Sequence, residues 1–213
     1  MDNTLLDFMT MKRMGIKAAI EAMIENCLDM NKDEGYKKLF YTYLKVGIES
    51  DTAFTEFLKN ETGKVEPKVL ASAINAYLKT KSETLNLYPD VIPTLKKLKE
   101  RGLKLIILTD APKVKAYQRL LVMKIDKFFD HVFGFEDTEK KKKTDIPLKT
   151  VLEKLKLNPK ETMMIGDSIT RDVIPAKKCD VISVWTKYGN SEKVDKIKPD
   201  YKLNNFSDIL KLG

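Results

Sequence analysis

Short apolar segments alternate with helix-like segments through the second half of the chain, and this alternation constrains the fold more than any other feature. The apolar segments are residues 105–108, 131–135, 162–165 and 181–185, and helical patterns between them cover residues 113–123, 146–156 and 171–178. Strands that are apolar throughout are buried on both faces, which is typical of a parallel sheet with helices on each side. The sequence therefore predicts an α/β fold with a doubly wound parallel sheet.

The first part of the chain has a different pattern. From residue 8 to residue 82 apolar residues recur at helical spacing, as at Leu70, Ile74 and Leu78, and no segment resembles a strand. The character changes near residue 88, after which Asp90 is a suitable N-cap and Gly102 a suitable C-terminal cap for a helix. We therefore predict a core formed by residues 1–7 and 83–213, with an all-helical domain of residues 8–82 inserted into it.

Composition limits the class of protein. The chain has 213 residues, of which 43% are hydrophobic and 33% charged, as expected of a soluble globular protein. No apolar run approaches the roughly 20 residues of a membrane-spanning helix, and no signal peptide is visible. Cys27 and Cys179 are too few for a disulfide framework. We therefore expect a cytoplasmic protein with no membrane partner.

The charge of the chain is positive but dispersed. The formal net charge is +8, and it comes mostly from lysines scattered over every predicted helix. Nucleic-acid readers instead cluster arginine with aromatic residues, so we expect no nucleic-acid partner, although anionic substrates would be attracted. The one histidine, His131, begins an apolar segment, which leaves catalysis to carboxylates, hydroxyls and lysine.

Candidate functional side chains follow the predicted strands, at the edge of the sheet where ligands bind in such folds. They are Asp2 near the start, Thr109 and Asp110 after residues 105–108, one lysine of the run 140–143, and Asp167 and Asp172 after residues 162–165. Two carboxylates on one loop favour Mg²⁺, which prefers oxygen ligands. Phosphoryl transfer needs positive charge around the phosphoryl oxygens, which Mg²⁺ and a lysine supply.

These residues occur in the order of the motifs of the haloacid dehalogenase-like (HAD) phosphohydrolase superfamily, which the chain resembles over essentially its whole length. The resemblance implies a helical cap inserted after the first core strand, and a Mg²⁺-dependent phosphatase of small phosphorylated metabolites with an aspartyl-phosphate intermediate. By matching, Asp2 would be the general acid and base, its backbone carbonyl also touching Mg²⁺. Thr109 and Asp110 would bind phosphate. Asp167 would bind the metal, supported by Asp172.

The catalytic lysine of the family is harder to match. An ungapped alignment of residues 152–161 with the family pattern places Lys142 at the catalytic position, with Lys143 as the alternative. The chain has Lys143-Thr144-Asp145 where the family commonly has prolines, so both lysines remain candidates.

The family's first motif reads Asp-x-Asp-x-Thr, and Met1 stands at the first x. The resemblance therefore implies a nucleophilic aspartate directly before Met1 and a first core strand that is missing from this chain. We expect the natural protein to extend upstream by about ten residues, enough for one strand, and the chain as given to lack hydrolase activity.

Two alternatives are consistent with this scaffold. A haloacid dehalogenase would use related chemistry without a metal, but Asp2, Asp167 and Asp172 together argue against it. A non-catalytic binding protein would explain the absent nucleophile. The sequence identifies neither the substrate nor the oligomeric state.

Overall fold

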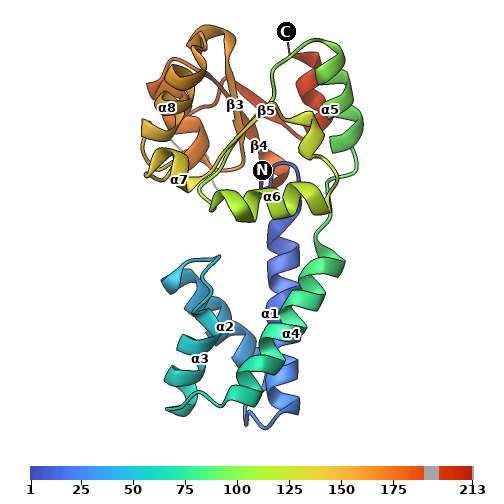
Figure 1. Cartoon of the computed structure of the whole chain (residues 1–213), viewed down its shortest axis with the longest axis vertical. Helices are drawn as coiled ribbons and strands as arrows, with labels where there is room; N and C mark the ends of the chain where they lie inside the picture. Colours follow the sequence, from blue (N-terminus) through green and yellow to red (C-terminus); the bar gives the residue numbers. More distant parts are fainter. Residues whose placement is uncertain (190–196, 213) are drawn as a thin grey trace. The chain divides into compact units, whose positions relative to one another are not determined.

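The computed structural model describes residues 1–189 and 197–212, and the chain divides into two compact units. One unit contains Met1–Asp7 and Asn86–Gly213, and the other contains Phe8–Leu85 (Figure 1). The predicted boundary between residues 82 and 83 falls inside a helix that continues to Thr84. In the described part of the chain, no helix is long and apolar enough to cross a bilayer.

The second unit is all-helical. Its helices are α1 (Phe8–Glu25), α2 (Lys32–Val46), α3 (Ala53–Thr62) and α4 (Pro67–Thr84). Asn31 caps α2 by accepting hydrogen bonds from the backbone N–H groups of Asp33 and Glu34, and Gly63 ends α3 with a φ of 71°, which glycine adopts without strain. The apolar residues that recur at helical spacing in this part of the sequence lie on these four helices.

The core of this helical unit contains a buried lysine. Lys12 on α1 is only 2% exposed, and its ammonium lies 3.0 Å from the hydroxyl of Tyr77 and 3.4 Å from the centre of the Tyr43 ring. Gly15, one turn further along α1, leaves room for the Tyr77 ring, which a Cβ would meet at 2.7 Å. The aromatic rings thus offset part of the cost of burying the ammonium.

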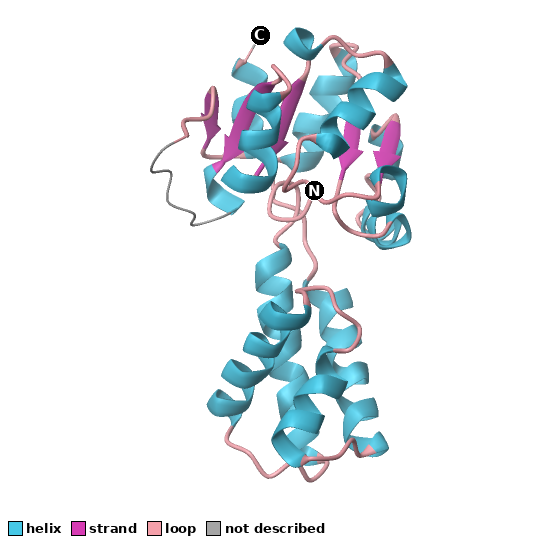
Figure 2. Ribbon diagram, turned by 90° about the vertical axis from the view of Figure 1, so that its left-hand side faces the viewer, coloured by secondary structure: helices cyan, strands magenta, loops and turns pink. Residues whose placement is uncertain are grey.

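The first unit is built on parallel strands. The strands are β1 (Ile106–Leu108), β2 (His131–Phe133), β3 (Met163–Gly166), β4 (Ile182–Thr186) and β5 (Tyr201–Leu203). They form two sheets, with the orders β1-β2 and β3-β4-β5, and every pair is parallel. Figure 2 shows the strands with helices on both sides. The structure confirms the predicted α/β class.

Helices cover both faces because apolar side chains of the strands point to both. The remaining helical elements are α5 (Val91–Glu100), α6 (Lys113–Val122), η1 (Asp126–Phe128), α7 (Phe135–Thr138), α8 (Ile146–Leu155), η2 (Pro159–Glu161), η3 (Ile169–Val173), α9 (Ile174–Lys178), η4 (Lys187–Gly189) and η5 (Phe206–Lys211). One apolar cluster joins α5, α6 and η5 to Ile107 and Val184. A second cluster joins α8 and α9 to Met164 of β3. The strands are therefore packed against two separate apolar clusters.

Three details differ from the prediction. The strand expected over residues 131–135 ends at Phe133, because the backbone N–H of Gly134 donates to the carboxylate of Asp137 at 2.8 Å and α7 begins. The helix expected over residues 171–178 begins earlier, as a π-helical turn from Ile169. Strand β5 was not predicted, since only Leu203 of its residues is buried. The strand expected before Met1 lies outside the sequence and stays a prediction.

Strand β4 is linked to the segment before β5 by one carboxylate. Asp200 accepts hydrogen bonds from the backbone N–H of Ser183 at 2.9 Å and from its hydroxyl at 2.6 Å. The other oxygen of Asp200 lies 2.8 Å from the ammonium of Lys177. The bonds from Lys177 and Ser183 lower the pKa of Asp200 to about 2. The ionised form of Asp200 therefore stabilises the folded protein.

We expect Asp200→Asn to lower the free energy of unfolding at pH 7 by about 0.5–1 kcal/mol, a modest value because the pair with Lys177 is partly exposed. The pKa of Asp200 is about 2 in the folded protein and about 3.9 in an unfolded chain. The stabilisation is therefore complete above about pH 4 and disappears as the pH falls toward 2. Urea unfolding across this range, with the exposed Asp180→Asn as control, tests the prediction; a difference that persists at pH 2 would contradict it.

Candidate functional site

The loop after β1 is shaped by a threonine. Thr109 is buried and its backbone N–H donates to the carbonyl of Phe133 at 3.0 Å, which continues the pairing of β1 with β2. Its hydroxyl accepts a hydrogen bond from the backbone N–H of Ala111 at 3.2 Å. The chain then turns at Pro112 into α6. Thr109 and Asp110 consequently lie at the carboxyl end of β1, where the sequence places them.

The loop after β3 folds tightly around Asp172. The backbone N–H of Ser168 donates to the carboxylate of Asp172 at 3.0 Å, and the π-helical turn η3 brings Asp172 back over the end of the strand. Gly166 is required here, because a Cβ at this position would overlap the side chain of Asp172. The two carboxylates predicted to share this loop, Asp167 and Asp172, are 5% and 2% exposed.

Lys142 connects these two loops. Its backbone N–H donates to the carboxylate of Asp110 at 2.7 Å, and its ammonium donates to the carboxylate of Asp172 at 2.6 Å. Lys142 is half-buried, whereas Lys141 and Lys143 on either side are exposed. Of the two sequence candidates for the catalytic lysine, the structure brings Lys142 to the acidic loop and leaves Lys143 in solvent.

The charges of this pair depend on each other. Burial by itself would raise the pKa of Asp172, but the Lys142 ammonium outweighs burial and holds that pKa below its usual value. Burial would lower the pKa of Lys142, and the carboxylate of Asp172 raises it instead. Both groups are therefore ionised at neutral pH. A buried pair of this kind is costly to break, because the remaining charge has no partner of opposite sign.

The opening segment meets the same loop. The side-chain amide of Asn3 donates to the carboxylate of Asp167 at 3.4 Å, and the hydroxyl of Tyr188 donates to the carbonyl of Thr4 at 2.7 Å. The indole N–H of Trp185, on β4, donates to the backbone carbonyl of Asp167 at 2.9 Å. These bonds place the start of the chain beside the end of β3, as the order of the sequence motifs implies.

The side chain of Asp2 pairs with an arginine that the sequence analysis did not single out. Its carboxylate accepts a hydrogen bond from the guanidinium of Arg119 on α6 at 2.8 Å. The Arg119 side chain is 4% exposed and that of Asp2 is 21% exposed. The structure thus directs the side chain of Asp2 to an arginine on another element.

The carboxylates after β3 are chemically suited to Mg²⁺. Burial and the neighbouring carboxylate of Asp172 raise the pKa of Asp167, so a cation beside Asp167 would relieve both effects. Asp172 already bonds to Lys142 and to Ser168, so Asp167 would be the direct ligand of a bound cation and Asp172 its support. Among the described residues no three His, Cys, Asp or Glu side chains form a metal-binding group. When it binds to proteins, Mg²⁺ takes one or two carboxylates and completes its shell with water and substrate oxygens.

Three contributors to the site were missed from the sequence. Asn3 lies between Asp2 and Thr4 in the segment that resembles the family's first motif, and its polar amide could have marked it as a site residue. Trp185 ends an apolar strand and reads as a core residue. Arg119 lies three residues after Ala116 on the buried face of α6, and that helical register was the signal that could have found it.

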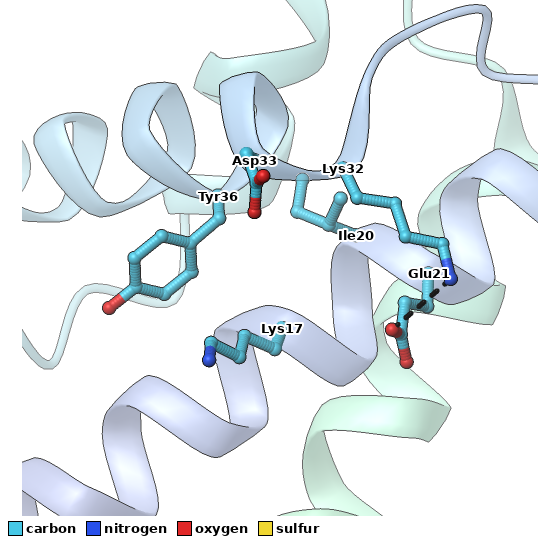
Figure 3. A pocket seen from close by; sticks show the side chains of 6 residues that line it. All are labelled: Lys17, Ile20, Glu21, Lys32, Asp33 and Tyr36. Atoms are coloured by element: carbon cyan, nitrogen blue, oxygen red, sulfur yellow. Dashed lines mark hydrogen bonds and ion pairs between the residues drawn. The ribbon is translucent and has the colours of Figure 1, made fainter.

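A separate small pocket lies in the helical unit between α1 and α2. It has a volume of about 170 Å³ and is lined by Lys17, Ile20, Glu21, Lys32, Asp33 and Tyr36 (Figure 3). Lys32 and Glu21 form an ion pair across 3.3 Å. No residue predicted to carry chemistry lines this pocket, and its two lysines and two carboxylates balance in charge. It therefore does not define the site.

The fold agrees with comparisons with known proteins. A family model described as haloacid dehalogenase-like hydrolase matches residues 1–186, and the chain belongs to that family. A glyceraldehyde 3-phosphate phosphatase from Pyrococcus furiosus is 29% identical over 215 aligned positions, covering 100% of this chain and 90% of the relative.

Solved structures show the same fold. A HAD phosphatase from Thermococcus onnurineus superimposes with a TM-score of 0.73 at 24% identity, covering 100% of this chain and 94% of the other. The HAD hydrolase YfnB from Bacillus subtilis, whose crystal structure is bound to magnesium, has a TM-score of 0.73 at 21% identity and covers 100% and 95% of the two chains. At these identities the likeness concerns the fold alone.

We expect Lys142→Met to lower the free energy of unfolding by about 3–5 kcal/mol, because it leaves Asp172 buried without its cation. The matched control is Lys143→Met, which removes an exposed ammonium and should change the free energy by less than about 0.5 kcal/mol. Urea unfolding of the two variants at pH 7 makes the comparison. Equal effects of the two substitutions would show that Lys142 does not hold the loop.

Proposed function

We propose that the protein is a Mg²⁺-dependent phosphatase of small phosphorylated metabolites. The observation that carries the proposal is the chain of contacts from Asp110 through Lys142 to Asp172, beside Asp167. It concentrates one ammonium and three carboxylates at the carboxyl ends of β1 and β3, where parallel sheets bind ligands. A lysine and a divalent cation are the charges that phosphoryl transfer requires.

The residues of the site have distinct roles in this proposal. Thr109 and the backbone N–H groups of its turn bind the phosphoryl oxygens, and the ammonium of Lys142 offsets their charge. Asp2 gives a proton to the leaving oxygen as its bond to phosphorus breaks, and later accepts a proton from the hydrolytic water. The phosphoryl group passes through an aspartyl-phosphate intermediate in this proposal.

Asp167, Asp172 and the backbone carbonyl of Asp2 are the groups that would hold Mg²⁺. When bound, the ion would supply positive charge to the phosphoryl oxygens. Asp167 binds it directly, and Asp172 keeps Lys142 and the Ser168 amide in place around it.

The relatives favour an organic phosphate ester as substrate. The phosphatase from Pyrococcus furiosus acts, by its name, on glyceraldehyde 3-phosphate and matches this chain over its whole length, including the helical unit. We therefore propose a short phosphorylated sugar or acid as substrate, and the helical unit as the cap that selects it. Caps of this kind exclude water from the reacting group.

A phosphate-release assay with the full-length protein tests this function. Glyceraldehyde 3-phosphate, phosphoglycolate, pyrophosphate and p-nitrophenyl phosphate are compared with Mg²⁺ and with EDTA. We expect Mg²⁺-dependent release from the three-carbon ester in preference to pyrophosphate. Halide release from chloroacetate without Mg²⁺ would instead identify a dehalogenase, and binding of phosphate esters without turnover would indicate a non-catalytic protein.

Metal binding gives a second prediction. We expect Asp167→Asn to weaken Mg²⁺ binding at least about tenfold, because a neutral amide is a poor ligand for a hard cation. The control is Asp180→Asn, which removes an exposed carboxylate before β4. Calorimetric titration with Mg²⁺ measures both variants, and unchanged affinity in Asp167→Asn would contradict the assignment.

A third prediction concerns the phosphate-binding turn. Thr109→Val removes the hydroxyl that accepts the Ala111 N–H, so we expect inorganic phosphate to bind about tenfold more weakly. Thr109→Ser, which keeps the hydroxyl, should bind phosphate nearly as well as the natural protein. Competition of phosphate with the substrate measures this, and equal inhibition constants in the two variants would overturn the role of the hydroxyl.

A further inference from the structure

Helix α6 directs its side chains in an unexpected way. The side chains that it buries are Ala116, Arg119 and Leu120. Four apolar side chains of the same helix are between 41% and 68% exposed: Val114, Tyr117, Leu121 and Val122. A helix usually buries its apolar residues and leaves arginine in solvent. An arginine held on the inward face therefore has a purpose other than filling the core.

The buried guanidinium has an acidic partner on the opening segment. Arg119 is 3% exposed, and its Nη1 donates to Oδ2 of Asp2 at 2.8 Å. The two residues are far apart in sequence and belong to different elements, so only the tertiary fold brings them together. A buried charge is costly without a partner of opposite sign, and Asp2 is such a partner for Arg119.

Asp2 needs an external restraint. It lies on a turn in which the backbone N–H groups of Thr4 and Leu5 both donate to the carbonyl of Met1, at 3.2 and 2.8 Å. No helix or long strand fixes the direction of its side chain there. A planar guanidinium with several donors sets both the position and the plane of a carboxyl group, which a lysine does less well.

We propose that Arg119 is the positioning residue of Asp2, which it holds so that the carboxyl group can exchange a proton with the leaving oxygen. The inference rests on the proposed function, in which Asp2 is the general acid. As the ester bond breaks, its electron pair goes to the leaving oxygen and the proton of Asp2 joins it there. Arg119 itself does not touch the substrate.

This role predicts a dependence on the leaving group. An alkyl oxygen needs protonation to leave, whereas p-nitrophenolate is stable without it. Displacing Asp2 should therefore damage the turnover of an alkyl phosphate far more than that of p-nitrophenyl phosphate. A loss of stability or a general distortion of the site would damage both reactions alike. The relevant constant is kcat/KM, which reports the steps up to departure of the leaving group.

The experiment measures kcat/KM of the full-length protein for glyceraldehyde 3-phosphate and for p-nitrophenyl phosphate. We expect Arg119→Met to lower the value for the alkyl ester at least about tenfold and the value for the aryl ester less than about threefold. Arg119→Lys keeps the buried positive charge but not the planar guanidinium, so its kcat/KM for the alkyl ester should fall less than that of Arg119→Met. The control Arg101→Met removes an arginine that bonds to the carbonyl of Leu210, and should leave both values unchanged.

Further variants make the result decisive. Asp2→Asn should show the same preference for the aryl ester, and adding Arg119→Met to it should cause little further loss, since both act on one step. If Arg119→Met does not fold, Arg119→Lys takes its place. The ratio of kcat/KM for the alkyl ester to kcat/KM for the aryl ester must then be lower in Arg119→Lys than in the natural protein.

Two negative results are distinguishable. Turnover of both esters by the natural protein, with the same ratio in every Arg119 variant, would overturn the role of Arg119 alone. Absence of phosphate release from either ester by the natural protein would overturn the proposed function, and this inference with it.

Discussion

The arrangement of the site depends on one buried ion pair, between Lys142 and Asp172. The ammonium reaches Asp172 at 2.6 Å, and the backbone of the same lysine is held by Asp110 at 2.7 Å. Three loops that are distant in sequence are therefore joined through a single residue. Both charged groups are largely shielded from solvent, so removing one of them leaves the other as a buried charge without its partner, which is costly. The pair consequently acts as a restraint on the sheet edge as well as a source of charge.

A second constraint is the space available after β3. Gly166 allows the carboxylate of Asp172 to lie against the backbone, and the π-helical turn that follows directs Asp172 to Lys142 and Ser168. The carboxylate of Asp167 accepts a longer and weaker bond, at 3.4 Å, from Asn3. The more strongly bonded carboxylate organises the loop, and the less strongly bonded one is the better candidate for a cation.

Much of this arrangement could be predicted from the sequence. The strands over residues 105–108 and 162–165 were recognisable because they are continuously apolar, and the polar residues after them follow from the geometry of a parallel sheet. Strand β5 could not be recognised, since its stability comes from pairing with β4 and from Leu203 alone. Residues 134–135 were assigned to a strand because they are apolar neighbours of one, and the hydrogen bond from Gly134 to Asp137 ends the strand.

The sequence by itself determined the class of fold, the helical unit and the set of candidate side chains, because hydrophobic periodicity and strand-end position are local properties. It also limited the candidates for a catalytic lysine to two adjacent residues, Lys142 and Lys143. The tertiary structure decided which of these lysines turns inward, and it directed the carboxylate of Asp2 to Arg119. Both outcomes depend on burial: a charge on one element is stable only where another element supplies its partner, and no local pattern records that partner.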